Sequence, residues 1–292
     1  MSKASLATQR QLLSVLSEGE FHSGQVLADT LGLSRTAIAN HIKQLQQLGL
    51  DIYKVKGRGY RLAEAITLLD AGKINLLRNV GCPDILVQHI TDSTNSQLMQ
   101  KVQDGLVTQP GYTLVAEAQT AGRGRRGRNW YSPFAASLYF SMYWRLEQGI
   151  QAAMGLSLVV AIAIARMLKQ QYQVDARVKW PNDILVNEKK ISGLIAEVVD
   201  DGVVIGIGIN VGMTAEELPV LTATSLAIEG VSDTNKNEIL ARVLALFESN
   251  FTTWDNGDNS VAQIYAALSS TLGTKVQIHY PNEQIEKGLA VA

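Results

Sequence analysis

The hydrophobic pattern of the first sixty residues predicts three short helices followed by a β-hairpin. Apolar residues recur at helical spacing over residues 12–16, and again after Ser23 and Ser34, two residues of a type that favours helix N-caps. We expect these helices to end near residues 19, 31 and 48. The last two are joined by Leu-Gly-Leu-Ser, which is the spacing of a helix-turn-helix, and a hairpin over residues 51–62 would follow as its wing.

The polar side of the third helix and the tip of the hairpin indicate DNA as the partner of this domain. Eight Lys or Arg residues against five acids give residues 1–65 a net charge of +3. In a winged helix-turn-helix, one helix enters the major groove and a basic wing contacts phosphates. A helical protein-interaction module with a solvated polar face is the alternative. The residues that we expect to contact DNA are Ser34, Arg35, Thr36, Asn40, Lys43, Lys56 and Arg58.

After a connector over residues 63–79, which carries a short helix, strand and helix patterns alternate. Strands are predicted at residues 86–90, 113–118, 137–144, 176–179, 184–186, 191–199 and 203–209. Helices are predicted from about residue 96 to 102 and at residues 153–171, 237–254 and 260–268. Short connections between several strands imply antiparallel pairing, so the pattern indicates an α+β fold with a mixed sheet.

Bulk composition excludes several classes of function and selects none. Of the 292 residues, 46% are hydrophobic and 18% charged, and the net charge is −1, so nucleic-acid binding must come from local charge. The single Cys82 excludes an internal disulfide, and the four scattered histidines lack metal-ligand spacing. No export signal is visible, and the most apolar stretch, residues 156–165, is too short to span a bilayer. We therefore expect a cytoplasmic protein without membrane contact.

One segment, Gln119–Trp130, concentrates positive charge in a way that requires an anion. It reads Gln-Thr-Ala-Gly-Arg-Gly-Arg-Arg-Gly-Arg-Asn-Trp, with four arginines and no acid. Its glycines fit the spacing of a dinucleotide fingerprint, but that motif needs a helix directly after the last glycine, and here Asn-Trp-Tyr-Ser-Pro follows. We interpret the segment, called the Arg loop below, as a flexible cationic loop that binds an anion.

Further polar motifs lie where predicted strands end, and each also has an ordinary structural explanation. The Ser-Thr-Asn run at residues 93–95 could cap the following helix, and Lys-Trp-Pro-Asn-Asp at residues 179–183 could be a turn. Lys189 and Lys190 could be a solvated hairpin tip. If Lys179 and Lys190 converge with the Arg loop, the site suits a strongly anionic substrate. No Ser/His or Cys/His pair for nucleophilic catalysis is visible.

Together these motifs resemble one family. Residues 122–130, the Lys-Trp-Pro-Asn-Asp run and the helix-turn-helix in front are similar to the bifunctional biotin–protein ligases that also repress the biotin operon. Residues 93–95 and 206–210 match as well. The resemblance implies an enzyme that uses ATP and Mg²⁺ to form biotinyl-5′-AMP and transfers biotin to a lysine of the biotin carboxyl carrier protein. It also implies that biotinyl-5′-AMP is a corepressor and that an adenylate-bound homodimer reads operator DNA.

The resemblance assigns roles to individual residues. Lys190 and Arg123 are expected to be catalytic through electrostatic stabilisation. The expected biotin-binding residues are Ser93, Thr94, Asn95, Gln119, Gly122, Arg123, Arg125, Lys190 and Gly193. The expected ATP-binding residues are Arg125, Arg126, Trp130, Lys179, Asn182, Asp183 and Asn210, of which Asp183 is also the candidate Mg²⁺ ligand.

The domain organisation implied by the resemblance has a short final part. Residues 1–65 would form the winged helix-turn-helix, 66–79 a connector, and 80–271 a catalytic domain with the biotin/lipoate ligase-like fold. The family ends in a small SH3-like β-barrel, which would begin near residue 272. Strands at residues 274–280 and 285–292 are only its first strands, so we expect an incomplete barrel with an unpaired edge.

Two other functions stay open on the sequence alone. One is a DNA-binding biotin sensor with weak or no ligase activity, which the short C-terminal part favours. The other is a lipoate-type ligase with the same catalytic fold, against which the attached helix-turn-helix argues. Pyrophosphate release and competition between biotin and lipoate would separate the three.

Overall fold

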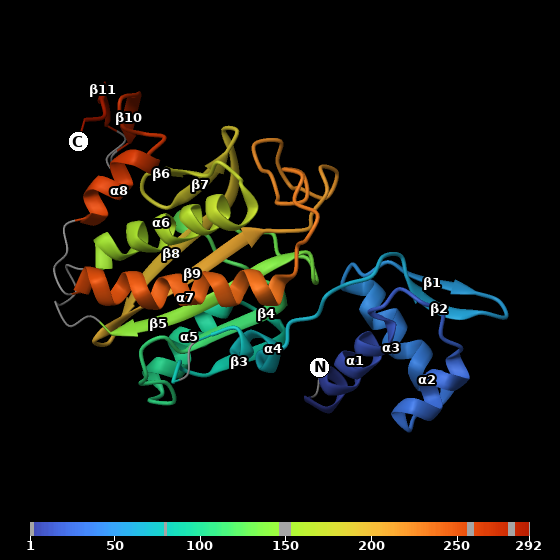
Figure 1. Ribbon diagram of the computed structural model, residues 1–292. Coiled ribbons are helices and arrows are strands. Elements are labelled where there is room, and N and C mark those ends of the chain that lie inside the picture. Colours follow the sequence, from blue (N-terminus) through green and yellow to red (C-terminus); the bar gives the residue numbers. More distant parts are fainter. Residues whose placement is uncertain (1–2, 79–80, 146–152, 256–259, 280–283, 292) are drawn as a thin grey trace.

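The structure, a computed structural model, describes residues 3–78, 81–145, 153–255, 260–279 and 284–291. A small helical unit at the N-terminus is followed by a connector and then by a larger unit built on a sheet (Figure 1). No described helix is both long enough and apolar enough to cross a membrane.

The N-terminal unit is the predicted winged helix-turn-helix. Its elements are α1 (Lys3–Leu16), α2 (Gly24–Leu31), α3 (Arg35–Gln47), β1 (Ile52–Val55) and β2 (Gly59–Leu62). Ser23 and Ser34 cap α2 and α3 as expected, each accepting a hydrogen bond of 3.1 Å from a backbone N–H of the first turn. Gly32 ends α2 with a left-handed φ of 64°, which turns the chain toward α3.

The larger unit confirms the predicted α+β class with a mixed sheet. Among the described residues, seven strands lie in the order β3-β4-β5-β9-β8-β7-β6, in which β3 and β4 are parallel and the other neighbouring strands antiparallel. Their bounds are β3 (Ile85–Thr91), β4 (Thr113–Gln119), β5 (Ser137–Arg145), β6 (Arg177–Lys179), β7 (Asp183–Val186), β8 (Lys189–Val199) and β9 (Gly202–Asn210). The helices are α4 (Ala71–Leu76), α5 (Thr94–Gln103), α6 (Ala153–Tyr172), α7 (Lys236–Asp255) and α8 (Ser260–Leu268).

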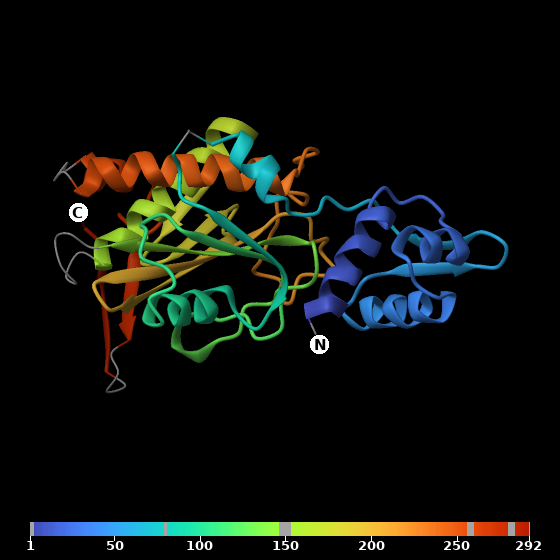
Figure 2. The same ribbon diagram turned by 90° about the horizontal axis from the view of Figure 1, so that it is seen from below.

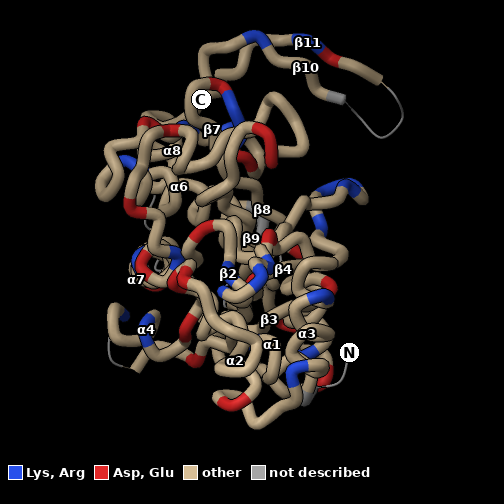
Figure 3. The backbone as a smooth tube through the Cα atoms, turned by 90° about the vertical axis from the view of Figure 1, so that its right-hand side faces the viewer, with Lys and Arg blue, Asp and Glu red and all other residues tan. Residues whose placement is uncertain are grey.

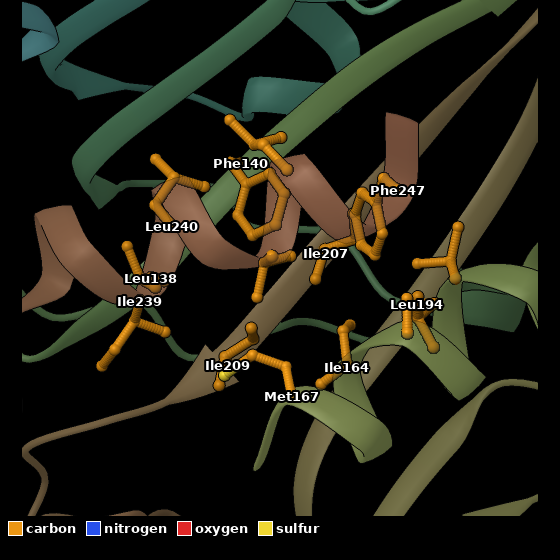
Figure 4. Packing of buried hydrophobic residues seen from close by; sticks show 14 of the residues in the cluster. Leu138, Phe140, Ile164, Met167, Leu194, Ile207, Ile209, Ile239, Leu240 and Phe247 are labelled. Atoms are coloured by element: carbon orange, nitrogen blue, oxygen red, sulfur yellow. The ribbon is translucent and has the colours of Figure 1, made fainter. Parts of the chain in front are cut away.

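The two faces of the sheet are covered unequally. Figure 2 shows α4, α6 and α7 stacked on one face and α5 alone on the other. Because α6 is apolar around most of its surface, it can be buried between the sheet and α7. Side chains such as Phe140, Ile207 and Phe247 fill this layer (Figure 4). The opposite face is left partly open beside α5, and this opening holds the candidate site.

The core of the N-terminal unit continues into the larger unit. One buried cluster joins Leu12 and Leu16 of α1 to Ala118 at the end of β4 and to Phe134. Arg10 of α1 also donates a hydrogen bond of 3.4 Å to the carbonyl oxygen of Leu69 in the connector. The N-terminal unit therefore packs directly against the end of β4 that leads into the Arg loop.

The connector is fastened to the start of α7. Asn237 accepts a hydrogen bond of 2.8 Å from Asp70 N and donates one of 3.0 Å to Leu68 O. Asp70 then caps α4 by accepting from Lys73 N at 3.0 Å. A chain that lacks regular structure over residues 63–70 is thus given a defined path by side-chain hydrogen bonds.

The C-terminal part forms a hairpin and, within the described residues, no barrel. β10 (Lys275–His279) and β11 (Ile285–Leu289) pair antiparallel with each other. Of the two strands predicted here, residues 280 and 292 lie outside the described residues. The second strand ends at Leu289 and is shorter than predicted, although backbone hydrogen bonds from Ala290 N to Thr274 O and from Gly273 N to Ala290 O still join the two segments beyond it.

Candidate active site and DNA-binding surface

A cleft lies on the open face of the sheet, between the first turn of α5, the Arg loop and the floor made by β8 and β9. The predicted residues that line it are Ser93, Thr94, Asn95, Gln119, Arg123, Arg125, Trp130, Asn182, Lys190 and Gly193. The convergence of the Arg loop with Lys190, which the sequence left open, therefore occurs. Arg123, Arg125 and Lys190 place three cations in one cleft.

Parallel pairing of β3 with β4 brings together the residues that follow these strands. Thr91 lies opposite Gln119 in the register, so α5 begins beside the end of β4. Gln119 Oε1 accepts hydrogen bonds from Thr94 N at 2.9 Å and Thr94 Oγ1 at 3.2 Å, while its Nε2 donates to Ser132 Oγ at 2.8 Å. The Gln119 amide is thus held in one orientation at the wall of the cleft.

Ser93 both caps α5 and lines the cleft. Its Oγ accepts from Ser96 N at 3.4 Å, so the ordinary capping explanation is correct, and the position also faces the site. Burial alone would raise the pKa of the preceding Asp92. Hydrogen bonds from Ser93 N–H and the Gln97 side chain outweigh burial and lower that pKa below its ordinary value. An ionised carboxylate at the start of α5 is favourable with the helix dipole.

The Arg loop is a small hairpin. Arg123 bridges to Asn129, Gly124 N donates to Arg128 O at 2.7 Å, and Trp130 N donates to Gly122 O at 2.8 Å. A single 3₁₀ turn over Arg125–Gly127 forms its tip. No α-helix begins after the last glycine, which confirms that the segment is not a dinucleotide fingerprint.

Two arginines fasten this hairpin to the sheet, one to β8 and one to the residue before β7. Arg123 makes a two-pronged ion pair with Glu197 of β8, with Nη1–Oε2 and Nη2–Oε1 distances of 3.0 and 2.7 Å. Arg125 Nη1 donates to Asn182 Oδ1 at 2.9 Å. The loop predicted to be flexible is therefore held across the cleft mouth by contacts within the chain.

Lys190 was expected at the tip of a hairpin, but it lies on β8. The tip is formed by Asn187 and Glu188, whose φ values of 48° and 62° make the tight turn, so that Lys189 already starts the strand. Lys190 Nζ is 2.6 Å from Asp183 Oδ1 and 5.2 Å from the centroid of the Trp130 ring. The strand thus fixes the lysine beside the aromatic wall.

Two paired glycines form the floor under Trp130. Gly193 and Gly208 lie opposite each other on β8 and β9. A Cβ on Gly208 would come within 2.3 Å of Trp130 Cε2, and one on Gly193 within 2.9 Å of Trp130 Cζ3. The indole packs directly on the backbone of these glycines, and a side chain at either position would displace it. Among the described residues, its buried Nε1 and the buried Nδ2 of Asn95 have no acceptor, which leaves two donors for a ligand.

Five predicted site residues are not part of the cleft lining. These are Gly122, Arg126, Lys179, Asp183 and Asn210. Gly122 packs against the backbone of Trp130, since a Cβ on this glycine would be 2.5 Å from Trp130 O. Asp183 contacts the lining residue Lys190 through an ion pair. Asn210 is buried and donates to Thr224 O at 2.9 Å, while Arg126 and Lys179 are exposed.

Several residues of the site were missed by sequence reasoning. Glu197 forms an ion pair with Arg123, and Ser132 Oγ accepts a hydrogen bond from the Gln119 side-chain amide. Ser141 Oγ lies 2.9 Å from Thr94 Oγ1. No local motif marks them. Only the alternation of β8, which places Glu197 on the same face as Gly193, could have pointed to the first.

The described residues contain no group of three or more His, Cys, Asp or Glu side chains that could hold a metal ion. Asp183, the one predicted metal ligand, is ion-paired with Lys190.

The predicted DNA-contacting residues are all exposed, on α3 and in the turn of the wing. Arg35, Thr36, Asn40 and Lys43 are exposed on α3, opposite its buried face, while Ser34 is occupied as the N-cap. Lys56 and Arg58 are exposed in the turn of the wing, and the Arg58 guanidinium lies 4.1 Å from the centroid of the Phe21 ring. Figure 3 shows Lys and Arg positions, in blue, on the tube around the β2 label.

Comparison with known proteins identifies both units. Residues 87–213 match the model of the biotin/lipoate A/B protein ligase family, and residues 8–61 match the model of an HTH domain. The bifunctional ligase/repressor BirA of Salmonella typhimurium is 43% identical over 238 residues, which cover 80% of this chain and 73% of that relative. The chain belongs to the biotin/lipoate A/B protein ligase family. The resemblance inferred from its motifs is confirmed.

Other members of the biotin/lipoate A/B protein ligase family support this assignment. The bifunctional ligase/repressor BirA of Escherichia coli is 39% identical over 269 residues, covering 86% of this chain and 82% of that protein. The biotin protein ligase of Aquifex aeolicus in complex with biotin and ATP superposes with a TM-score of 0.61 at 29% identity, covering 70% of this chain and 85% of that chain.

Proposed function

We propose that this chain is an ATP-dependent biotin–protein ligase that also acts as a biotin-responsive transcriptional repressor. It forms biotinyl-5′-AMP and pyrophosphate, then passes the biotinyl group to a lysine of the biotin carboxyl carrier protein. The observation that carries this proposal is the meeting of Arg123, Arg125 and Lys190 in one glycine-floored cleft, on a chain that also has a helix-turn-helix.

The arrangement of charges suits the first half-reaction. A biotin carboxylate must approach the α-phosphate of ATP, and two unit charges ~4 Å apart repel by about 4 kcal/mol at an effective dielectric of ~20. Cations aimed at the reacting oxygens offset this repulsion and stabilise the charge of the transition state. Lys190 and Arg123 are the proposed sources of this stabilisation, since both line the cleft, one from β8 and the other from the Arg loop.

Biotin binding is proposed for the side of the cleft next to α5. The Thr94–Gln119–Ser132 network gives polar groups of fixed orientation, and the Asn95 amide supplies a buried free donor. The complete proposed set is Ser93, Thr94, Asn95, Gln119, Gly122, Arg123, Arg125, Lys190 and Gly193.

The nucleotide is proposed to lie on the Trp130 side. The indole offers an aromatic face for the adenine, and Arg125 is linked to Asn182 at the cleft mouth. Arg126, Lys179, Asp183 and Asn210 remain proposed ATP contacts outside the lining. Closure of the Arg loop would exclude water from the mixed anhydride of biotinyl-5′-AMP, which water hydrolyses.

The residues near the cleft fit a Mg²⁺ ion only if ATP brings it. Mg²⁺ keeps several water ligands and is usually bound by one or two carboxylates together with substrate phosphates. Asp183 is the carboxylate that this chain would contribute, in competition with its Lys190 partner. When bound, the ion would neutralise part of the charge on the phosphates.

For repression, we propose that α3 and the wing contact operator DNA through Ser34, Arg35, Thr36, Asn40, Lys43, Lys56 and Arg58, and that biotinyl-5′-AMP is the corepressor. A homodimer formed with bound adenylate would read two half-sites. The proposed domains are residues 1–65 for DNA binding, 66–79 as connector and 80–271 for catalysis. Residues 272–292 would be the start of an SH3-like barrel, since β10 and β11 already form a hairpin.

Incorporation of labelled biotin into a carrier domain tests the proposal. The intact chain should label the carrier in the presence of ATP and release pyrophosphate, and omission of ATP should abolish both. Tight biotin binding without pyrophosphate release would support a biotin sensor instead. Preferential use of lipoate in a competition assay would identify a lipoate-type ligase, which the family model also includes.

A further inference from the structure

The guanidinium of Arg123 connects three separate elements around the cleft. It is held by both carboxylate oxygens of Glu197 on β8, at 2.7 and 3.0 Å. Its Nη1 also lies 3.4 Å from Asn95 Oδ1 and 3.4 Å from Ser96 Oγ, both on α5. Glu197 therefore fixes where the guanidinium lies, because a two-pronged pair restricts both its position and its plane.

The same contacts orient the amide of Asn95. Since Asn95 Oδ1 faces the Arg123 guanidinium, its Nδ2 is directed toward β9, 3.2 Å from where a Cβ on Gly206 would lie. That Nδ2 is buried and has no acceptor among the described residues. A buried free donor facing a cleft is costly unless a ligand supplies the acceptor.

We propose that Glu197 is a positioning residue, which holds Arg123 and, through it, Asn95 in the geometry that retains the adenylate. This inference rests on the proposed ligase function. Glu197 lies outside the cleft lining, so it acts through Arg123 and not by contact with the ligand. It also keeps the first arginine of the loop in place, while Asn182 holds Arg125.

The exposure of the pair separates this role from a purely structural one. The side chains of Arg123 and Glu197 are 43% and 27% exposed, and ion pairs of this kind contribute little to the stability of a fold. Removing the carboxylate should therefore leave thermal unfolding almost unchanged and alter the retention of the ligand. A role of Glu197 in folding would show the opposite result.

The test measures the rate at which preformed biotinyl-5′-AMP leaves the enzyme. Labelled adenylate is formed on the intact chain from biotin and ATP, and its loss is followed after a chase with unlabelled biotin. Glu197→Gln should release it about three- to tenfold faster. Glu188→Gln is the matched control, because it removes the same charge at the exposed turn before β8 and should match the parent. Glu197→Asp, which keeps the charge with a shorter reach, should fall between them.

A double-mutant cycle decides whether Glu197 acts through Arg123. In an Arg123→Gln background, Glu197→Gln should have no further effect on the release rate. Release at the parent rate in Glu197→Gln, or the same fold increase in both backgrounds, would overturn the inference. If Glu197→Gln does not fold, Glu197→Asp takes its place, and release at the parent rate would count equally against the inference. A parent chain that makes no adenylate at all would refute the proposed function itself.

Discussion

Lys236 and Glu117 form an ion pair of 2.9 Å in which each side chain is only 3% exposed. Lys236 starts α7, and Glu117 lies on β4 two residues before Gln119 of the cleft wall. The other carboxylate oxygen of Glu117 accepts a hydrogen bond of 2.5 Å from Leu69 N in the connector. This pair therefore joins the connector of the DNA-binding unit, the start of α7 and the strand that leads to the cleft.

Removing one member of this pair should destabilise the chain strongly. Lys236→Met leaves the Glu117 carboxylate buried without its cation, and we expect a loss of about 3–5 kcal/mol in the free energy of unfolding. Adding Glu117→Gln, which removes the stranded charge but keeps an acceptor for Leu69 N, should restore a large part of it. Denaturant unfolding of the two variants and the parent measures this. Equal losses in the single and double variants would show that the ion pair is not the source of the effect.

Two adjacent lysines allow a matched test of the catalytic assignment. Lys190 lines the cleft beside Asp183 and Trp130, while Lys189 is exposed at the first position of β8. Lys190→Ala should slow pyrophosphate release from biotin and ATP about 10²- to 10³-fold, which is typical for loss of one group that stabilises transition-state charge. Lys189→Ala should leave the rate close to that of the parent. A similar loss in both variants would indicate a general charge effect and exclude a specific role for Lys190.

The stability of the chain should fall in acid because of His89. Burial is the main reason that the pKa of His89 is lowered to about 4; the Glu117 carboxylate opposes this shift, and the Arg10 guanidinium contributes to it. Its ring lies edge-on to Phe134, with centroids 4.8 Å apart, at the contact with the DNA-binding unit. In the unfolded chain His89 binds a proton below pH ~6.5, whereas in the folded chain it does so only near pH 4. The free energy of unfolding therefore decreases as the pH falls through this window.

The effect of His89 should approach about 1.4 kcal/mol for each pH unit within that window. Denaturant midpoints measured from pH 7 to 4 test this, with His89→Gln as the comparison. The variant should show a flatter dependence on pH over the same range. Parallel curves for parent and variant would mean that another group is responsible for the acid sensitivity.

DNA binding should be separable from ligation. Lys43→Ala on α3 or Arg58→Ala in the wing should weaken operator binding and reduce its salt dependence by a slope of about one, if each contacts one phosphate. Transfer of biotin to the carrier should be unchanged, since neither residue borders the cleft. Lys73→Ala removes an equal charge from exposed α4 and should leave operator binding unaltered. Loss of both activities in Lys43→Ala would indicate misfolding.

The order and type of most elements follow from the sequence, because caps and periodicity act locally. Ser23 and Ser34 mark the starts of α2 and α3, and Gly32 marks the end of α2; these caps act within a few residues and do not depend on how the unit packs. The alternating pattern gave the strands of the larger unit and their antiparallel neighbours. The Arg loop and the Lys-Trp-Pro-Asn-Asp run also identified the family, since such motifs depend on residue types and spacing.

Only the tertiary structure decided which of these residues meet. The parallel pairing of β3 with β4 places Thr94 against Gln119, and the turn at Asn187–Glu188 moves Lys190 from a tip into the cleft. The partners of the cationic residues, Glu197 for Arg123 and Asp183 for Lys190, come from strand register, which no local pattern encodes. The burial of Phe134 against the DNA-binding unit likewise depends on the contact between two units that are distant in the sequence. Local sequence determines conformation over a few residues, whereas a site assembled from distant segments is fixed by long-range packing.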